Sequence, residues 1–146
     1  MTEVAFHFNV PEFVPYACRL LRKATQARAQ VTVVAAEAEL RHLDTRLWTF
    51  AADEFLPHCL WDAPPEVLAR SPVVLTPSLQ LDHLPHREVM LHWGATQAPP
   101  GFESYARLIE LVSTDEADRI QARGRWKHYS DRGYPISRYD VSLSAR

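Results

Sequence analysis

The chain has 146 residues, of which 47% are apolar and 23% charged, so it can bury a substantial core and has the composition of an ordinary globular domain. A net charge of −2 argues against general binding to nucleic acid, and no apolar run approaches the roughly 20 residues that a membrane-spanning helix needs. The N-terminal Met1-Thr2-Glu3 places an acid where a signal peptide carries base. We therefore expect a single cytoplasmic domain over residues 1–146, without membrane contact.

The first third of the chain predicts alternating strands and helices. Residues 4–8 are aromatic and β-branched, as in a strand, and Pro11 opens a helical pattern that runs to about Ala27. Residues 31–35 form a β-branched run that is typical of a buried parallel strand. A second helix over about 36–50 has acidic residues in its first turn, where they favour the helix dipole. Because such a crossover is right-handed and joins parallel strands, the pattern predicts a mostly parallel sheet.

The glycine positions argue against the cofactor site that many such sheets carry. The four glycines lie at 94, 101, 124 and 133, whereas the first strand–helix turn reads Asn9-Val10-Pro11-Glu12. A bulky turn that contains a proline cannot bring backbone amides against a pyrophosphate. We therefore expect an α/β fold, a Rossmann-like three-layer domain with a mostly parallel sheet, that lacks a dinucleotide-binding glycine motif and takes no nucleotide cofactor.

Prolines and apolar runs divide the second half of the chain. Residues 60–72 contain three prolines and predict a loop, and strands are expected at 73–75, 88–93 and 108–112. The last helix should begin after Ser113-Thr114 and end near Arg132, with Gly133 as its stop. The residues expected to pack this helix on the sheet are Ala117, Ile120, Gly124 and His128. The tail residues expected to fold back along it are Tyr134, Ile136 and Tyr139.

The titratable residues form no catalytic pattern. Asp44 and the Asp53-Glu54 pair resemble solvated or capping carboxylates, and no nucleophile or phosphate-binding motif is present. Cys18 and Cys59 are not clustered, which is typical of reduced, buried thiols. A metal site at His58-Cys59 is conceivable, but adjacent residues seldom bind one ion, so we expect no metal. The sequence favours a binding module over an enzyme.

The last helix carries a stripe that is both basic and aromatic. Arg119, Arg123, Trp126 and Lys127 fall at i, i+4, i+7 and i+8. Residues 119–132 hold five Arg or Lys against Asp131, so this segment carries +4 and the rest of the chain −6. Arginines one turn apart can bind a carboxylate through forked hydrogen bonds, and an indole offers a wall for an aromatic ring. The stripe would fit a short acidic peptide ending in phenylalanine. The alternative is a set of exposed basic residues with Trp126 in the core.

A second apolar feature lies near the middle of the chain. Leu40, Leu43, Leu47 and Phe50 follow one helix face, and Trp48 lies just off it. The segment Phe55-Leu56-Pro57-His58 follows, and its proline prevents the helix from continuing. A tryptophan and a phenylalanine flanked by proline would anchor an interface if exposed, and would be ordinary core if buried. Residue types leave both interpretations open.

Two segments resemble a known family. The strings LDTRLWTF (43–50) with FLPH (55–58), and ARGRWKHYSDRGY (122–134), resemble the signature segments of the chi subunit of bacterial DNA polymerase III holoenzyme, in matching order and spacing. The likeness covers essentially the whole chain. It implies a non-catalytic accessory subunit that bridges the psi/clamp-loader assembly to the acidic C-terminal tail of single-stranded DNA-binding protein during DNA replication. Nucleic acid would be reached only indirectly.

The resemblance also implies roles for individual residues. For binding the tail of single-stranded DNA-binding protein it implies Val112, Arg119, Arg123, Trp126, Lys127, Tyr129 and Gly133. For binding psi it implies Trp48, Phe55, Leu56, Pro57 and His58. Trp126 stands where the family usually has an aromatic residue, often tyrosine, and tryptophan in place of tyrosine removes a hydroxyl. A repair helicase could share the Trp48 surface.

Two other functions remain open at the level of the sequence. One is a small α/β hydrolase or nucleotide-binding enzyme with a pocket at the carboxyl ends of the strands. The other is direct binding of single-stranded DNA by the basic helix at 119–132, which should grow with DNA length and weaken steeply with salt.

Overall fold

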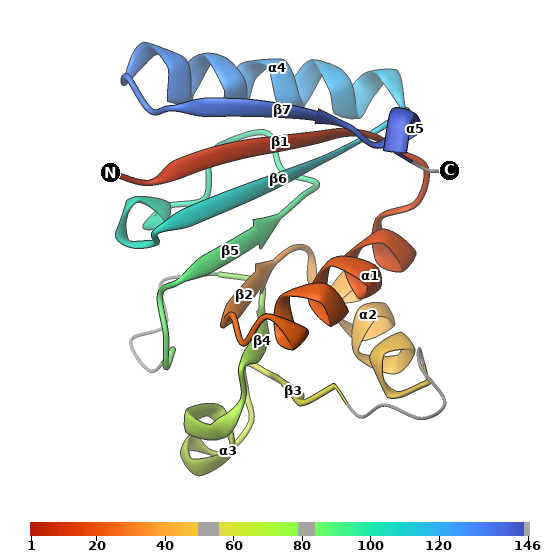
Figure 1. The fold of residues 1–146 in the computed structure, drawn as a ribbon, viewed down its shortest axis with the longest axis vertical. Coiled ribbons are helices and arrows are strands. Elements are labelled where there is room, and N and C mark those ends of the chain that lie inside the picture. The colour runs from red at the N-terminus through yellow and green to blue at the C-terminus, as the bar shows by residue number, and fades with distance from the viewer. Residues whose placement is uncertain (50–55, 79–83, 145–146) are drawn as a thin grey trace.

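The computed structural model describes residues 1–49, 56–78 and 84–144 (Figure 1). Its strands are β1 Glu3–Val10, β2 Val31–Val34, β3 His58–Leu60, β4 Val73–Thr76, β5 Val89–His92, β6 Arg107–Ser113 and β7 Ile136–Asp140. Its helices are α1 Phe13–Gln26, α2 Glu37–Thr49, α3 Pro65–Arg70, α4 Glu116–Asp131 and α5 Val141–Ser144, with a 3₁₀ turn at Phe102–Ser104. Among these described helices, none has the length and apolar character needed to cross a membrane.

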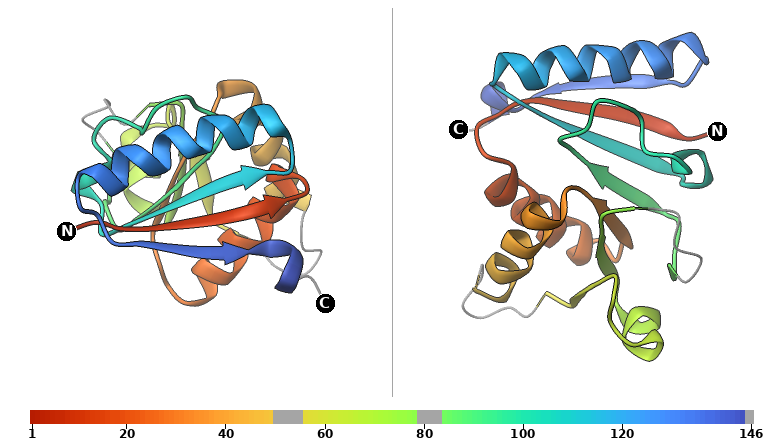
Figure 2. Two further views of the ribbon diagram at one scale, coloured as in Figure 1. Left: turned by 90° about the horizontal axis from the view of Figure 1, so that it is seen from above. Right: turned by 180° about the vertical axis from the view of Figure 1, so that it is seen from behind.

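The seven strands form one sheet in the order β3-β4-β2-β5-β6-β1-β7, and all the pairings are parallel. The connections through α1 and α2 run along the sheet in one direction, and those through α3 and α4 run in the other. Right-handed crossovers therefore place α1 and α2 on one face and α3 and α4 on the opposite face (Figures 1 and 2). This arrangement confirms the predicted three-layer α/β fold, with a sheet that is parallel throughout.

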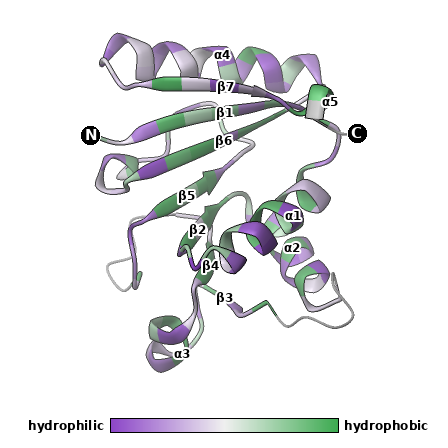
Figure 3. Ribbon diagram, viewed as in Figure 1, coloured by the Kyte–Doolittle hydropathy of each residue, from purple (hydrophilic) through white to green (hydrophobic). Residues whose placement is uncertain are grey.

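Each face of the sheet has its own apolar core, because successive side chains of a strand point to opposite faces. In β6, Leu111 joins the core beneath α1 and α2, whereas the next residue, Val112, joins the core beneath α4. Strands β2, β4 and β5 are accordingly buried along their whole length and are mostly apolar (Figure 3). On α2, the predicted face formed by Leu40, Leu43 and Leu47 is buried, and Phe50 lies outside the described residues.

The prediction of a loop at 60–72 was wrong. Helix α3 begins at Pro65, where a proline suits the first turn because its missing N–H has no partner there in any helix. Leu68 of this helix packs on Cys59 of β3 and Val74 of β4. Three closely spaced prolines suggested an irregular segment, yet two of them sit at the helix start and the third lies after its end.

The predicted packing face of the last helix was wrong for three of its four residues. Ile120 is 57% exposed, and Ala117 and Gly124 lie on the solvent side as well, whereas His128 is half-buried against Phe102. The residues of α4 that are buried against the sheet are Ala122, Arg125 and Tyr129. An arginine is rarely fully buried unless it is paired, so the pattern of apolar residues could not reveal that Arg125 faces inward.

Candidate functional site

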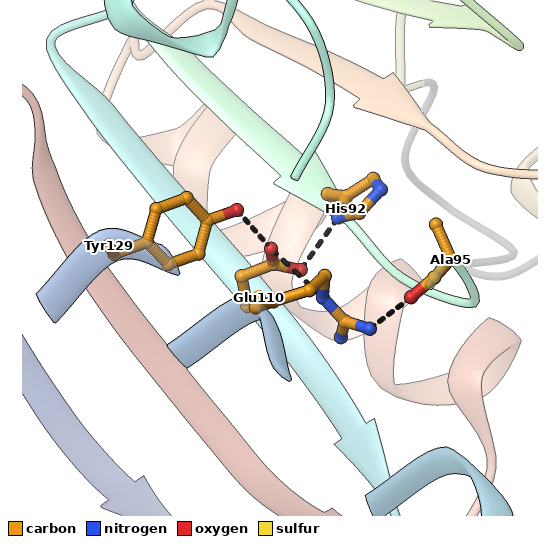
Figure 4. A network of polar contacts seen from close by, with 5 residues as sticks. His92, Ala95, Glu110 and Tyr129 are labelled. Atoms are coloured by element: carbon orange, nitrogen blue, oxygen red, sulfur yellow. Dashed lines mark hydrogen bonds and ion pairs between the residues drawn. The ribbon is translucent and has the colours of Figure 1, made fainter. Parts of the chain in front are cut away.

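A buried polar network fixes α4 on the sheet (Figure 4). Glu110 of β6 accepts hydrogen bonds from His92 Nδ1 at 2.6 Å, from Arg125 Nε at 3.2 Å and from the Tyr129 hydroxyl at 2.5 Å. Arg125 also donates from Nη1 to the carbonyl of Ala95. All four ionisable side chains are essentially excluded from solvent. The contacts join β5, β6 and α4, so they set the rotation of the helix about its own axis.

The charges of this network compensate one another. Burial alone would raise the pKa of Glu110, but the contacts with His92, Arg125 and Tyr129 outweigh it and hold this pKa below its ordinary value of 4.5. Burial, and next the negative charge of Glu110, raise the pKa of the Tyr129 phenol. Glu110 is therefore a carboxylate and Tyr129 a neutral donor at physiological pH. Arg125 neutralises the buried carboxylate and is not part of an exposed basic patch.

The rotation set by the network turns the next face of α4 toward a cavity of about 410 Å³. The cavity lies between the helix and the sheet. Its lining consists of Phe6 and Phe8 of β1, Val112 of β6, Arg119, Ala122, Arg123 and Trp126 of α4, and Arg138 of β7. Its floor is apolar and aromatic, while its charged lining residues are arginines. Strand β7 forms one wall of this cavity through Arg138.

The two predicted arginines face the same hollow. Arg119 and Arg123 are both exposed and both line the cavity. Arg123 Nη1 lies 3.6 Å from Glu116 Oε1, but the two side chains are 65% and 66% exposed. Such a solvated pair is worth about 0–1 kcal/mol and yields readily to a better anion.

Trp126 satisfies both of the interpretations that its sequence position left open. Its ring packs on that of Phe6, with centroids 4.9 Å apart and planes tilted by 48°. The residue is only half-buried, however, and its remaining surface lines the cavity. Trp126 therefore closes the edge of the core and provides an aromatic wall at the same time.

Three residues of the predicted tail site lie away from the cavity lining. Lys127 pairs with Asp131 on the outer face of α4, with Nζ and Oδ2 3.1 Å apart. Tyr129 belongs to the buried network. Gly133 follows the helix with φ +78°, a conformation that favours glycine, and its N–H donates to the carbonyl of Ser130 at 3.0 Å. These residues shape the helix that carries the site.

Phe6, Phe8 and Arg138 line the cavity but were missed from the sequence. Phe6 and Phe8 alternate in β1 and so share one sheet face, a signal that was readable once the strand was predicted. Arg138 lies in β7, whose polar sequence Ile136-Ser137-Arg138-Tyr139-Asp140 gave no strand signal. Tyr134 and Ile136 do pack with the core beneath α4, as expected for the tail, and Ile136 does so from a strand paired with β1. Tyr139 does not, because it lies on the opposite face of the sheet against His7.

The region around Trp48 forms a separate hollow at the other edge of the sheet. Trp48 is 59% exposed, and its ring centroid lies 4.9 Å from that of His58. The His58 side chain is buried, with Nδ1 2.7 Å from the carbonyl oxygen of Leu56 and Nε2 3.0 Å from Asp44 Oδ1. The buried ring of His58 thus packs against the indole of Trp48 and supports it.

The remaining residues of the predicted psi surface have different positions. Leu56 is buried in the core beneath α2, Pro57 is half-buried, and Phe55 lies outside the described residues. Pro57 lines the hollow together with Trp48 and residues of α3. Among the described residues that line it, the charged ones are Asp44, Asp62, Glu66 and Arg70, so acids outnumber bases.

Two regions bear on the metal and nucleotide alternatives: the surroundings of Cys59 and the end of β1. Cys59 is buried and free, and in residues 1–49, 56–78 and 84–144 no three His, Cys, Asp or Glu side chains gather as metal ligands would. Asn9, near the end of β1, has φ 62°, and Pro11 lies between β1 and the start of α1 at Phe13.

These features define a Rossmann-like three-layer α/β protein with a cationic, aromatic-walled cavity at one edge of its sheet. The family model for the DNA polymerase III chi subunit, HolC, matches residues 1–137, and the chain belongs to this family of accessory replication subunits. It is 36% identical over 145 residues to the DNA polymerase III subunit chi of Pseudomonas aeruginosa strain PAO1, covering 93% of this chain and 94% of that protein. It is 28% identical over 127 residues to the subunit chi of Haemophilus influenzae strain Rd, with 86% and 85% covered.

Proposed function

We propose that this chain is a non-catalytic accessory subunit of the bacterial DNA polymerase III holoenzyme. In the cytoplasm it would bridge the psi/clamp-loader assembly to the acidic C-terminal tail of single-stranded DNA-binding protein. The observation that carries the proposal is the cavity beneath α4, where Arg119 and Arg123 border a floor made by aromatic and aliphatic side chains.

The chemistry of the cavity fits an acidic chain end with a terminal phenylalanine. Guanidinium groups bind carboxylates through short, forked and charge-assisted hydrogen bonds. Val112, Phe6 and Trp126 offer the apolar surface on which an aromatic ring can be buried. Two such contacts support an affinity in the micromolar range, about −8 kcal/mol, which suits a tether that must be released and remade.

The Trp48 hollow is the proposed psi surface. An exposed tryptophan beside a proline is the kind of anchor that dominates interface energy. This hollow lies by β3 and α3, whereas the tail cavity lies by β7 and α4, at the opposite end of the strand order (Figure 1). Both partners can therefore be held at once, as a bridging subunit requires. A repair helicase could use the same tryptophan when psi is absent.

The test is a titration of the whole chain with a synthetic acidic peptide that ends in phenylalanine. The expected result is micromolar binding of the free-acid peptide and binding at least about tenfold weaker when the terminal carboxylate is amidated, since one charged hydrogen-bond partner is lost. A control peptide has the same composition with the phenylalanine moved inward. Failure of the free-acid peptide to bind would contradict the proposal.

Two companion measurements separate the rival functions. Titration with single-stranded DNA of several lengths, at low and high salt, should show no length-dependent binding by the chain alone, in contrast to a direct DNA binder. The burial of Arg125 supports this expectation, because it removes one of the five basic residues at 119–132 from the surface of the helix. Nucleotides and divalent metals should leave the melting temperature unchanged, whereas an enzyme that binds them would be stabilised.

A further inference from the structure

The cavity beneath α4 has a third cation, on the wall opposite the helix. Arg138 lies in β7, directly beside Phe6 of β1 in the parallel register, and paired residues of neighbouring strands point to the same sheet face. Figure 1 shows β7 running under α4. Arg138 therefore enters the cavity from the sheet, whereas Arg119 and Arg123 enter it from the helix.

The guanidinium of Arg138 is already positioned by aromatic rings. Its Cζ atom lies 5.1 Å from the ring centroid of Phe8 and 5.9 Å from that of Trp126, within the about 6 Å range of cation–π contacts. The nearest acid on its own strand, Asp140, is engaged by Asn9 Nδ2 at 3.0 Å and by Ser142 Oγ at 2.6 Å. In the described part of the chain no carboxylate forms an ion pair with Arg138.

A planar guanidinium that stacks on aromatic walls keeps its N–H edge available for a carboxylate. An aromatic ligand ring buried on the cavity floor would lie against the same walls. The backbone carboxylate of a chain-terminal residue is only one side-chain length from its ring, so it would fall beside Arg138. At about 410 Å³ the cavity lies near the lower end of the about 300–1,000 Å³ of ligand pockets, which suits a chain end more than an internal segment.

We infer that Arg138 is a specificity-determining residue that binds the terminal carboxylate of the docked peptide, while Arg119 and Arg123 bind acidic groups from the helix side. This inference rests on the proposed function of the cavity. The free C-terminus of the peptide would then be bound from two sides, by Arg138 of β7 and by Arg119 and Arg123 of α4. Both elements would contribute to selectivity.

The experiment is a cycle of two proteins and two peptides. Wild type and Arg138→Gln are titrated with the acidic peptide ending in phenylalanine, as the free acid and as the C-terminal amide. Arg138→Gln should bind the free acid about tenfold or more weakly and the amide with unchanged affinity, so that the preference for a free carboxylate disappears. Arg138→Lys should recover part of that preference, because it keeps the charge and loses the planar fork.

The matched control is Arg132→Gln. Arg132 is an exposed arginine at the C-terminal cap of α4, where Nη1 donates to the carbonyl of His128 at 3.2 Å, and it does not line the cavity. This substitution removes the same charge and should leave the preference for the free acid intact. Arg138 is exposed on an edge strand, so circular dichroism should show an unchanged fold for its variants.

The outcomes distinguish this inference from the proposed function. Equal weakening of both peptides by Arg138→Gln, or no weakening of either, would overturn the role given to Arg138 while the proposed function stood. Failure of wild type to bind the free-acid peptide would overturn both.

Discussion

The tail cavity and the Trp48 hollow are built alike but carry opposite charge. Each places a partly exposed tryptophan on a buried ring: Trp126 packs on Phe6, and Trp48 packs on His58. The charged lining residues of the tail cavity are arginines, whereas among the described residues of the Trp48 hollow acids predominate. An acidic partner is therefore attracted to one edge of the sheet and disfavoured at the other. Charge thus favours the tail cavity over the Trp48 hollow as the place where an acidic tail would bind.

The two regions also differ in how firmly they are held. Glu110, Arg125, His92 and Tyr129 are almost completely buried and are connected through a single carboxylate. The Asp44–His58 pair has fewer partners, and the Asp44 side chain keeps 26% of its exposure. A buried charge network is far more sensitive to losing one member than a solvated pair is. The comparison leads to five predictions, in order of decreasing effect.

The largest effect is expected for Glu110→Gln. It leaves the buried Arg125 without a counter-charge and should lower the free energy of unfolding by about 3–5 kcal/mol, as measured by urea denaturation. Asp44→Asn should cost only about 1 kcal/mol, because water can reach the carboxylate it replaces. Equal losses for the two variants would contradict the difference between the regions. Glu103→Gln, at an exposed carboxylate, is the control.

The same network should make stability depend on acid pH. The pKa of Glu110 is lower in the folded chain than its ordinary value of 4.5, so its contribution is complete above that value and is lost as the pH falls toward the folded-state pKa. Unfolding free energies measured from pH 7 downward should fall over this window in wild type, and this part of the fall should be missing in Glu110→Gln.

Arg123→Ala should weaken binding of the acidic tail peptide by about 2–3 kcal/mol, because it removes a charged hydrogen-bond partner from the cavity. Peptide titration by calorimetry measures this loss. Arg132→Ala, outside the cavity lining, should bind like wild type. If Arg123→Ala binds the tail peptide as tightly as wild type, Arg123 does not contribute to tail binding.

Trp48→Ala should weaken psi binding by about 2 kcal/mol or more and leave tail binding unchanged. Pull-down with psi and titration with the tail peptide test the two sites separately. Ile120→Ala changes an equally exposed apolar residue on the outer face of α4 and should affect neither. Loss of both partners in Trp48→Ala would point to unfolding and not to a local interface.

The smallest effect is expected for Lys127→Ala. Lys127 forms an exposed i, i+4 pair with Asp131 and does not line the cavity, so stability and tail affinity should each change by less than about 0.5 kcal/mol. Thermal unfolding and peptide titration measure both. A loss as large as that of Arg123→Ala would place Lys127 in the site, as its sequence position suggested.

Local patterns predicted much of this fold. The β-branched run at 31–35 and the apolar face of α2 each depend on neighbours in sequence, and both were confirmed. The spacing of Arg119, Arg123 and Trp126 likewise predicted residues that the structure brings to one cavity. In contrast, the inward rotation of α4 depends on Arg125 meeting Glu110 across the sheet, which no periodicity encodes.

The position of Arg138 on the sheet side of the cavity could not be predicted from the sequence for a related reason. Arg138 acquires its place only because β7 pairs with β1, a contact between the two ends of the chain. The strand β7 is polar and lies at the edge, so its sequence lacks the β-branched signature of the interior strands. Long-range pairing, and not local propensity, puts this residue into the site.

The placement of β1 between β6 and β7 determines when the cavity can form during translation. Val4 pairs with Leu108 on one side and with Ile136 on the other. Strand β1 can therefore complete its pairing only after nearly the whole chain has been translated. Phe6 and Phe8 meet α4 only at that moment. A nascent chain therefore has no formed cavity until β7 has been made and has paired with β1.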